Sequence, residues 1–447
     1  MSLLNRIEEN IILPANDILT GNLISQSLRF LLKSQGWQHE RHIEFQNERL
    51  RFIIHHAYEN IPFYHDLFRE KKLVPSDIKN ISDLQKIPVI NKDDFRKHPP
   101  EYYHTRNISR RNIIRLNSSG STGEPFTYYI DREAFSMNYA SAIRGWYWMG
   151  YRLGDTYAKL SQNPRSAYGK KIQDMFTRSL YLFIRDLTKE NLLKVLYRLN
   201  NEQPEYIRCY PDPLLFISVL INEGNELQYS PKAINTTGNI LTPESREKIE
   251  KAFRAPVFDS YSCEASAQFF EGPDRDVYYA SAEYAVTEVI DHMNNPSAMG
   301  RHITTDLWNM AMPFIRYDTQ DIIDRADRHQ NPEIHLPAFK QIKGRNSDIL
   351  ITPSGKYLIV HTFTIFFEYF EEIDQFQVIQ NKPDSINVLL VVNERYDKKA
   401  EREIYEGLVR LIGNDVLIEL STVKQIPILS SGKRRFIVRE ESIKLAL

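Results

Sequence analysis

The spacing of apolar residues changes near residue 112 of this chain. Before that point, stretches such as RLRFIIHHAYENI at 49–61 repeat apolar residues every three or four positions, which predicts helices, and Pro62 follows as a stop signal. The stretch SDLQKIPVINKDDFRKHPPEYY at 82–103 mixes a short apolar run with prolines, which is typical of a connector. We therefore expect a helical lead-in over about residues 1–110.

Beyond residue 112, short runs of strand-forming residues alternate with helical stretches. The run IIRLNSSGSTGEPFTYYID at 113–131 predicts two strands joined by a polar loop. Helical patterns follow at 132–150 and 211–225. They alternate with strand-like runs at 233–238, 255–262, 283–291 and 312–323. Such alternation favours an α/β architecture with a substantial sheet.

A boundary is expected near Arg345, because FKQIKGRNSDILITPSGKYL at 339–358 combines glycines with charges. The pattern of the last hundred residues predicts two strands around a turn at 374–394, an amphipathic helix at 398–415 and another strand at 416–428. The sequence thus predicts a large multi-layer domain at 1–344, with β-sheets flanked by helices, and a small α+β domain at 345–447.

Composition excludes several classes of protein. The 447 residues suffice for two or three domains, and the 57 basic and 58 acidic side chains nearly cancel, which argues against a general affinity for nucleic acid. Cys209 and Cys263 cannot form a disulfide framework, and no cluster has zinc-ligand spacing. No apolar run is long enough to cross a bilayer, and the first residues lack a signal-peptide pattern, so we expect a cytoplasmic protein.

The polar loop NSSGSTGEP at 117–125 is the first candidate functional feature. Hydroxyl side chains and glycines after a strand can turn several hydrogen-bond donors toward one anion. The loop is not a Walker A motif, because the Gly-Lys-Ser/Thr sequence is absent. From the residues alone, a phosphate-binding loop and a solvated hairpin both remain open.

The stretch SSGSTGEP resembles the phosphate-binding loop of the adenylate-forming superfamily, and the resemblance is nearest to its phenylacetate–CoA ligase and CapK branch. Four further stretches resemble segments of this branch and follow in the same order. They are an adenine-binding segment at 233–265, a T-x-L…P-x-I-R-Y-x-x-G-D segment at 300–322, a hinge at 342–350 and a C-terminal lysine loop at 428–437. The resemblance implies the fold of adenylate-forming enzymes, in which the small C-terminal domain is a mobile lid.

The resemblance also implies an ATP site. The polar loop would donate hydrogen bonds to the β- and γ-phosphates, Tyr261 would stack on adenine, and Asp321 would bind the ribose hydroxyls. Arg345 would reach the same ribose or a phosphate. The complete set of expected ATP-binding residues is Ser118, Ser119, Gly120, Ser121, Thr122, Gly123, Thr237, Gly238, Asp259, Ser260, Tyr261, Asp321 and Arg345.

Lys433 is the expected catalytic residue. In the family this lysine enters with the small domain and bridges the attacking carboxylate and the α-phosphate, a task that suits a point charge on a flexible stem. On local sequence alone, SSGKRR also fits a β-turn followed by solvated charges.

The resemblance implies Mg²⁺, for which one carboxylate and phosphate oxygens suffice as ligands. The family commonly reads Tyr-Gly-x-x-Glu, but this chain reads Tyr261-Ser262-Cys263-Glu264-Ala265. Either the loop is one residue shorter and Glu264 is the ligand, which is our assignment, or Ala265 occupies the position of the glutamate. Other departures from the family pattern are Asn239, Gln320 before Asp321, and Ser347 in the hinge.

The acid substrate is expected between the sheets and the helices that carry Trp146, Tyr147 and Tyr210, although each ring also fits ordinary core packing. No Arg or Lys stands out as the partner of a distal charge on the acid.

Three functions fit the sequence. The first is carboxylate–CoA ligation through an acyl-adenylate. The second transfers the activated acyl group to an amine or hydroxyl, for instance on a sugar for a surface polysaccharide, since CapK-type relatives are associated with capsule pathways. The third is a degenerate nucleotide-binding protein without turnover. The expected partners are ATP, Mg²⁺, a small carboxylic acid, and CoA or a sugar or amine acceptor; a monomer and a homodimer both remain open.

Overall fold

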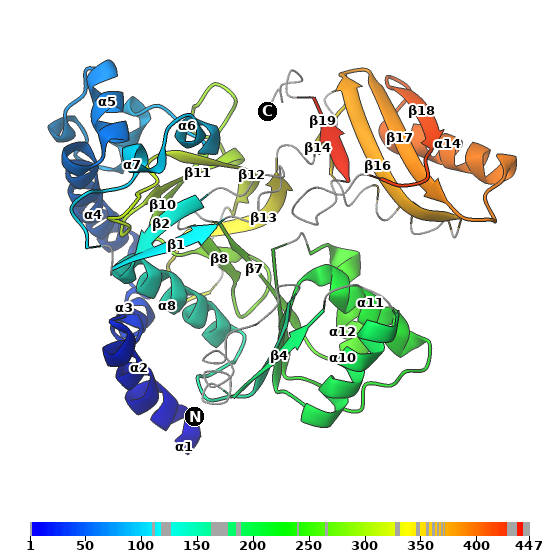
Figure 1. Ribbon diagram of the computed structural model, residues 1–447, viewed down its shortest axis with the longest axis horizontal. Coiled ribbons are helices and arrows are strands. Elements are labelled where there is room, and N and C mark those ends of the chain that lie inside the picture. The colour runs from blue at the N-terminus through cyan, green and yellow to red at the C-terminus, as the bar shows by residue number, and fades with distance from the viewer. Residues whose placement is uncertain are drawn as a thin grey trace.

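The structure is a computed structural model. It describes residues 2–109, 112–117, 127–161, 178–184, 189–238, 241–263, 267–326, 331–345, 349–354, 357–359, 363, 366–367, 370, 372–426 and 436–440. The predicted phosphate loop at 118–123, Glu264 and Lys433 lie outside these residues. Figure 1 shows a large unit, coloured from blue to yellow, and a smaller unit in orange and red beside it.

The lead-in is helical, as the apolar spacing predicts. Its helices are α1 (Leu3–Ile7), α2 (Leu13–Thr20), α3 (Ile24–Ser34), α4 (His39–Asn60), α5 (Pro62–Glu70), α6 (Lys92–Arg96) and α7 (Pro100–Tyr103). Pro62 does follow the end of α4, but it is also the first residue of α5, where a missing N–H group costs nothing. The expected connector at 82–103 contains the short helices α6 and α7.

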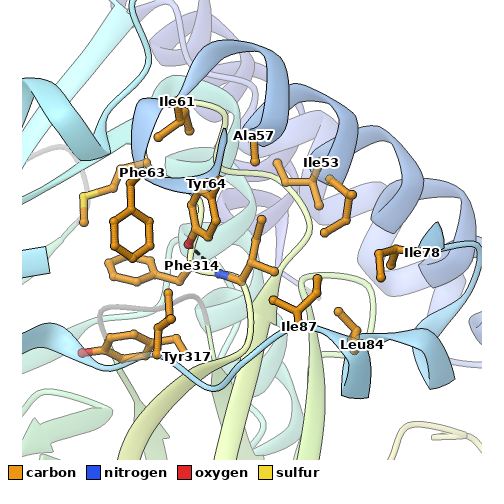
Figure 2. Packing of buried hydrophobic residues seen from close by; sticks show 14 of the residues in the cluster. Ile53, Ala57, Ile61, Phe63, Tyr64, Ile78, Leu84, Ile87, Phe314 and Tyr317 are labelled. Carbon is orange, nitrogen blue, oxygen red and sulfur yellow. Dashed lines mark hydrogen bonds between the residues drawn. The ribbon is translucent and has the colours of Figure 1, made fainter. Parts of the chain in front are cut away.

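A mainly apolar core joins this lead-in to the large sheet, as Figure 2 shows. Ile53 of α4 and Phe63 of α5 pack in one cluster with Phe314. The buried hydroxyl of Tyr64 donates to the carbonyl of Pro313 at 2.7 Å and accepts from the N–H of Ile315 at 3.0 Å. Because both partners are backbone groups, Tyr64 fixes the chain just before strand β12 (Tyr317–Arg325).

The expected strand at 312–323 is wrong in its first part, since β12 begins at Tyr317. The preceding residue, Arg316, has φ of 53°, which ends any extended run before it. Its buried guanidinium donates to the carbonyls of Gln85 at 3.2 Å and Ile87 at 2.7 Å, which keeps Arg316 in that conformation.

The large sheet confirms the α/β expectation. Among the described residues eleven strands form one sheet, in the order β10-β11-β12-β13-β9-β8-β7-β6-β5-β3-β4. The parallel half contains β3 (Tyr157–Ser161), β4 (Ser179–Phe183), β5 (Tyr206–Cys209), β6 (Ala233–Thr237) and β7 (Val257–Ser262). The antiparallel half contains β8 (Gln268–Glu271), β9 (Tyr278–Ala280), β10 (Ala285–Ile290), β11 (Met299–Asp306), β12 and β13 (Ala338–Arg345).

Helices cover both faces of the parallel half, as is usual for parallel strands. One apolar cluster contains residues of α10 (Lys189–Glu202), α11 (Pro211–Asn222) and α12 (Pro243–Phe253), together with Ile207 and Val257 of the sheet. A second cluster joins α3 and α8 (Arg132–Trp148) to the opposite face, where Tyr206 and Phe258 lie. Figure 1 shows the three green helices α10, α11 and α12 grouped beside β4.

A buried ion pair ties α8 to α3 and to the sheet. The guanidinium of Arg144 and the carboxylate of Glu283 have no exposed side-chain surface, and they make two contacts, at 2.8 and 3.2 Å. The hydroxyl of Ser34 donates to the same carboxylate at 2.5 Å. Although burial opposes charge, Arg144 holds the pKa of Glu283 below its ordinary value.

The smaller unit is the predicted α+β structure. Its sheet has the order β18-β17-β16-β19, with a helix against it. These elements are β16 (Ile373–Lys382), β17 (Ser385–Val392), α14 (Lys398–Ile412), β18 (Leu417–Thr422) and β19 (Ile437–Arg439), and a short hairpin of β14 (Ile349–Ile351) and β15 (Tyr357–Ile359) precedes them. All buried residues of its core come from positions 350–437.

Within the described residues, none of the helices combines the length and the apolar character that a bilayer requires.

Candidate active site

Several predicted site residues meet at one edge of the large sheet. Strands β5, β6 and β7 are parallel, so their carboxyl ends lie side by side, and this is where open α/β sheets bind ligands. Thr237 at the end of β6 is directly opposite Ser260 near the end of β7. Gly238 and Tyr210 follow the ends of β6 and β5. The sequence predicted these four residues, and the fold brings them together.

Gly238 is required by the close approach of Tyr210. Gly238 has φ of 83°, a conformation that favours glycine, and a Cβ atom there would lie 2.5 Å from Cε1 of the Tyr210 ring. Any side chain at position 238 would therefore displace the ring. This edge of the sheet thus presents exposed backbone beside an aromatic side chain, which is a suitable surface for a flat ligand.

Tyr261, Asp321 and Arg345 form the second part of the site. The hydroxyl of Tyr261 donates to Oδ2 of Asp321 at 2.5 Å. Asp321 on β12 is directly opposite Arg345 on β13. Burial, and then the charge of Asp321, raise the pKa of Tyr261 well above its ordinary value, so its hydroxyl stays a donor. Residues predicted for adenine and ribose are therefore in direct contact.

The ring of Tyr261 packs against other aromatic rings, while its hydroxyl contacts Asp321. Its ring makes edge contacts with Phe269 at 5.5 Å and with His302 at 5.8 Å between ring centroids. Burial lowers the pKa of His302 to about 3, so the imidazole is neutral at physiological pH. Aromatic rings beside a neutral imidazole suit the flat face of a nucleobase.

Asp259 lies in a buried polar network beside the site. Its carboxylate accepts hydrogen bonds from Thr236 at 2.5 Å and from Tyr278 at 2.8 Å. Burial, and then the charge of Glu271, raise its pKa to about 7. Ser260, the next residue, instead receives a hydrogen bond from Asn235 at 3.2 Å. Neighbouring residues of a strand point to opposite faces of the sheet, so the side chains of Asp259 and Ser260 lie in different surroundings.

The three rings expected around the acid substrate lie in different places. Trp146 lines a narrow pocket between α8 and the sheet. Tyr210 stands at the carboxyl edge, against Gly238. Tyr147 does not line the pocket; its hydroxyl donates to Glu9 at 3.1 Å, and Arg152 lies 4.5 Å from its ring centre. Successive residues of a helix point about 100° apart, which is why Trp146 and Tyr147 separate.

Arg208 lies beside Trp146, and no sequence pattern singled it out. It lies on β5 and lines the same pocket as Trp146, with its guanidinium 5.1 Å from the Trp146 ring centre. A single arginine in the short run Tyr206–Cys209 carries no motif. The alternation of strand residues was the only available signal, since Ile207 and Cys209 pack in the opposite cluster and leave Arg208 to face α8.

The predicted phosphate loop joins two described strands. These strands are β1 (Ile113–Asn117) and β2 (Thr127–Asp131), which pair antiparallel with Asn117 opposite Thr127. The strand–loop–strand expectation is confirmed for the strands, while the loop itself lies outside the described residues. Among the described residues, no group of three His, Cys, Asp or Glu side chains would hold a metal ion.

Comparison with known proteins adds independent information. A family model described as the CapK C-terminal domain matches residues 350–440. The chain is similar to protein CapK of Staphylococcus aureus, with 25% identity over 417 residues that cover 88% of each chain. It is 37% identical to phenylacetate-coenzyme A ligase of Escherichia coli over 329 residues, which cover 68% of this chain and 71% of that protein.

The fold also matches a solved enzyme structure. The structure is 2-hydroxyisobutyryl-CoA ligase in the postadenylation state, in complex with R3-HIB-AMP. The match has a TM-score of 0.70 and 18% sequence identity, and it covers 92% of both chains. The similarity therefore extends over the large sheet and the smaller unit.

Proposed function

This chain belongs to the CapK and phenylacetate–CoA ligase branch of the adenylate-forming ligases, and we propose that it activates a small carboxylic acid with ATP and then forms a thioester with CoA. In the first step, a carboxylate oxygen attacks the α-phosphorus and the bond to the β-phosphate breaks, which gives an acyl-adenylate and pyrophosphate. In the second, the sulfur of CoA attacks the acyl carbon and AMP leaves.

The observation that carries the proposal is the meeting of Thr237, Gly238, Ser260, Tyr261 and Asp321 at one sheet edge. Tyr261 offers a ring for adenine, and Asp321 offers a carboxylate to a pair of ribose hydroxyls. The contact between Tyr261 and Asp321 fixes the carboxylate before ATP binds, so little reorganisation is needed.

The remaining roles belong to residues outside the described part of the chain. We assign Ser118 to Gly123 to the β- and γ-phosphates and Glu264 to Mg²⁺, an ion that supplies positive charge beside those phosphates. Lys433 is assigned to the attacking carboxylate and the α-phosphate, where it would offset the charge that develops in the transition state.

Release of pyrophosphate with a panel of acids tests the first step. Lys433→Ala is expected to lower its rate by about 100- to 1,000-fold while ATP binding persists, because the lysine acts mainly on charge that develops during the reaction. Lys424→Ala removes an exposed lysine from the same unit and should leave the rate unchanged. Comparable turnover by Lys433→Ala would remove this lysine from the mechanism. ATP binding without pyrophosphate from any acid would instead indicate a protein without turnover.

Transfer to an amine or hydroxyl is a second candidate for the acceptor step. The chain is similar to CapK over 88% of both chains, and CapK-type relatives are associated with capsule pathways, which supports this candidate. An active mixture should be supplied with CoA in one experiment and with an amino sugar in another, and the products identified by mass. A thioester supports the first acceptor, and an acylated sugar supports the second, including a role in surface polysaccharide synthesis.

A further inference from the structure

Asp321 lies in a bulge of strand β12. The pairing between β11 and β12 shifts at this point, so that one residue of β11, His302, faces the three residues 319–321 of β12. Bulges interrupt the regular alternation of a strand and turn a side chain in a new direction, and they are common beside active sites. The position of the Asp321 carboxylate therefore depends on what holds the bulge in shape.

Three hydrogen bonds hold the bulge from within. The hydroxyl of Thr319 donates to the carbonyl of His302 at 3.1 Å and accepts from the N–H of Asp321 at 3.2 Å. The N–H of Gln320 donates to Oδ1 of Asp318 at 2.7 Å. Because Gln320 is in the left-handed conformation, with φ of 66°, the bulge persists only while such contacts hold it.

Arg301 of β11 holds the other oxygen of Asp318. Its guanidinium donates to Oδ2 at 2.8 Å, so both oxygens of this carboxylate accept hydrogen bonds. The same guanidinium donates to Oδ1 of Asn294 at 2.5 Å and to the carbonyl of Asp291 at 3.4 Å. These two residues lie in the turn between β10 and β11, which is closed by a hydrogen bond of 3.2 Å between them. Arg301 thus ties the bulge to a turn that is itself ordered.

The pair between Arg301 and Asp318 lies mostly inside the protein. The side chain of Arg301 is 21% exposed and that of Asp318 is 12% exposed. Water and salt screen such a pair less than a pair on the surface, so it fixes the geometry around it more firmly. Without the guanidinium, Asp318 is expected to turn toward solvent and release the N–H of Gln320. The bulge would then relax, and the carboxylate of Asp321 would lose its fixed position.

We propose that Arg301 is a positioning residue for the nucleotide. Through Asp318 it orders the bulge that directs the carboxylate of Asp321 at the two ribose hydroxyls, and it thereby sets the preference for nucleotides that carry both. This inference rests on the proposed function, because that function places the ribose at Asp321. Two hydroxyl groups can donate to one carboxylate only when it is held in place, and a shift of about 1 Å weakens both hydrogen bonds.

The test compares ATP with 2′,3′-dideoxy-ATP, which keeps the base and the triphosphate, using kcat/KM for pyrophosphate release. The wild-type protein should prefer ATP by about 100-fold or more, because the dideoxy nucleotide lacks two hydrogen bonds to a charged group. Arg301→Met should lower kcat/KM for ATP by about 10-fold, mainly through KM, and change the dideoxy value by less than about twofold. Arg301→Lys keeps the charge without the fork of donors, so it should recover part of the preference.

Arg275→Met is the matched control, since Arg275 forms a partly exposed ion pair with Glu250 elsewhere in the large unit. It should leave the preference for ATP unchanged, even if it lowers Tm. An Arg301→Met protein that keeps the full preference for ATP, or that loses activity equally with both nucleotides, would overturn the inference.

The double variant of Arg301→Met with Asp318→Ala tests the route. Because Arg301 acts through Asp318, the double variant should show the same preference for ATP as Asp318→Ala alone. Losses that add in full would overturn this route, because Arg301 would then influence the ribose without Asp318.

Equilibrium binding of the two nucleotides without an acid separates this inference from the proposed function. A preference for ATP that weakens in Arg301→Met but persists in Arg275→Met supports the role of Arg301 even if no acid releases pyrophosphate, a result that would count against adenylation alone. Equal binding of ATP and 2′,3′-dideoxy-ATP by the wild type would overturn the inference, whatever the assays with acids show.

Discussion

Gln320 occupies a backbone conformation that residues with a Cβ atom rarely adopt. Its φ is 66°, and its N–H donates to Oδ1 of Asp318 at 2.7 Å, which holds the turn just before Asp321. The family motif usually has glycine here, and the structure gives the physical reason for it, since glycine enters this region without steric cost. The turn survives the departure because Asp318 stabilises it.

Gln320→Gly is expected to raise the free energy of unfolding by about 0.5–1 kcal/mol, since relief of the left-handed strain outweighs the extra entropy of the unfolded chain. Thermal melting followed by circular dichroism would measure the gain. Gln341→Gly is the control, because Gln341 is an exposed residue of β13 without positive φ, where glycine should lower stability. An unchanged or lower Tm in Gln320→Gly would contradict this account.

Asp259 makes stability depend on pH. Its pKa in the folded protein is raised to about 7, above that of the unfolded chain, so the folded state holds the proton more tightly. This contribution is fully present below the unfolded pKa of about 4 and is lost as pH rises toward 7.

The variant Asp259→Asn lacks this titration. As the pH rises from about 5 to about 8, its free energy of unfolding should therefore increase by about 2 kcal/mol relative to that of the wild type. Denaturant unfolding of both proteins at each pH would show the difference. Asp276→Asn, at an exposed position, should show a constant difference from the wild type over the same range. A constant difference for Asp259→Asn as well would mean that the buried carboxyl titrates normally.

At the scale of elements, α8 lies unusually close to strand β8. Gly145 is in the last part of α8, and a Cβ atom there would lie 2.2 Å from Cγ of Phe270. Glycine within a helix costs about 1 kcal/mol relative to alanine, and this close contact offsets that cost. The adjacent residue, Trp146, is thereby held against the sheet, where it lines a narrow pocket together with Arg208.

Gly145→Ala should therefore lower the free energy of unfolding by about 1–3 kcal/mol despite the better helix propensity of alanine. It should also raise KM for the acid, because α8 and Trp146 must move away from the sheet. Gly36→Ala serves as the control, since the nearest atom to a Cβ there is 3.9 Å away. Melting curves and acid titrations test both effects, and a stabilised Gly145→Ala protein would show that α8 can shift at no cost.

The sequence predicted elements wherever the pattern was local. The two strands at 113–131, the hairpin of β16 and β17 and the helix α14 were confirmed because alternation, turn residues and helical spacing specify them within a few positions. Arg208 and Tyr147 depended on which side of a strand or helix faces the pocket, and that depends on distant packing. Motif resemblance predicted Tyr261 and Asp321 for one site, and the fold brings the two side chains into direct contact, which the sequence could not show.

The whole molecule consists of units with separate cores. Leu390 of β17 is fully buried in a cluster made only of residues 350–437, while the clusters of the large unit contain none of these residues. We propose that the smaller unit is the mobile lid, with a boundary near Arg345. A lid that moves as a body must hold its shape by its own packing.

Calorimetry should accordingly show two unfolding transitions. Leu390→Ala should lower the free energy of unfolding of the small unit by about 2–5 kcal/mol and leave the transition of the large unit in place. The reason is that the cavity left by the substitution lies wholly inside the small unit. An ATP analogue should raise the midpoint temperature of the transition of the large unit. One cooperative transition that shifts as a whole would show that the two cores unfold together.

The ion pair between Arg144 and Glu283 also limits the evolutionary routes open to this fold. Loss of either partner alone leaves a stranded charge and costs about 3–5 kcal/mol, whereas an apolar pair of similar volume is tolerated. Descendants of this chain therefore inherit both residues or exchange both in quick succession. We therefore expect substitutions at this junction of α3 and α8 to occur in pairs, because a single change leaves one buried charge without its partner.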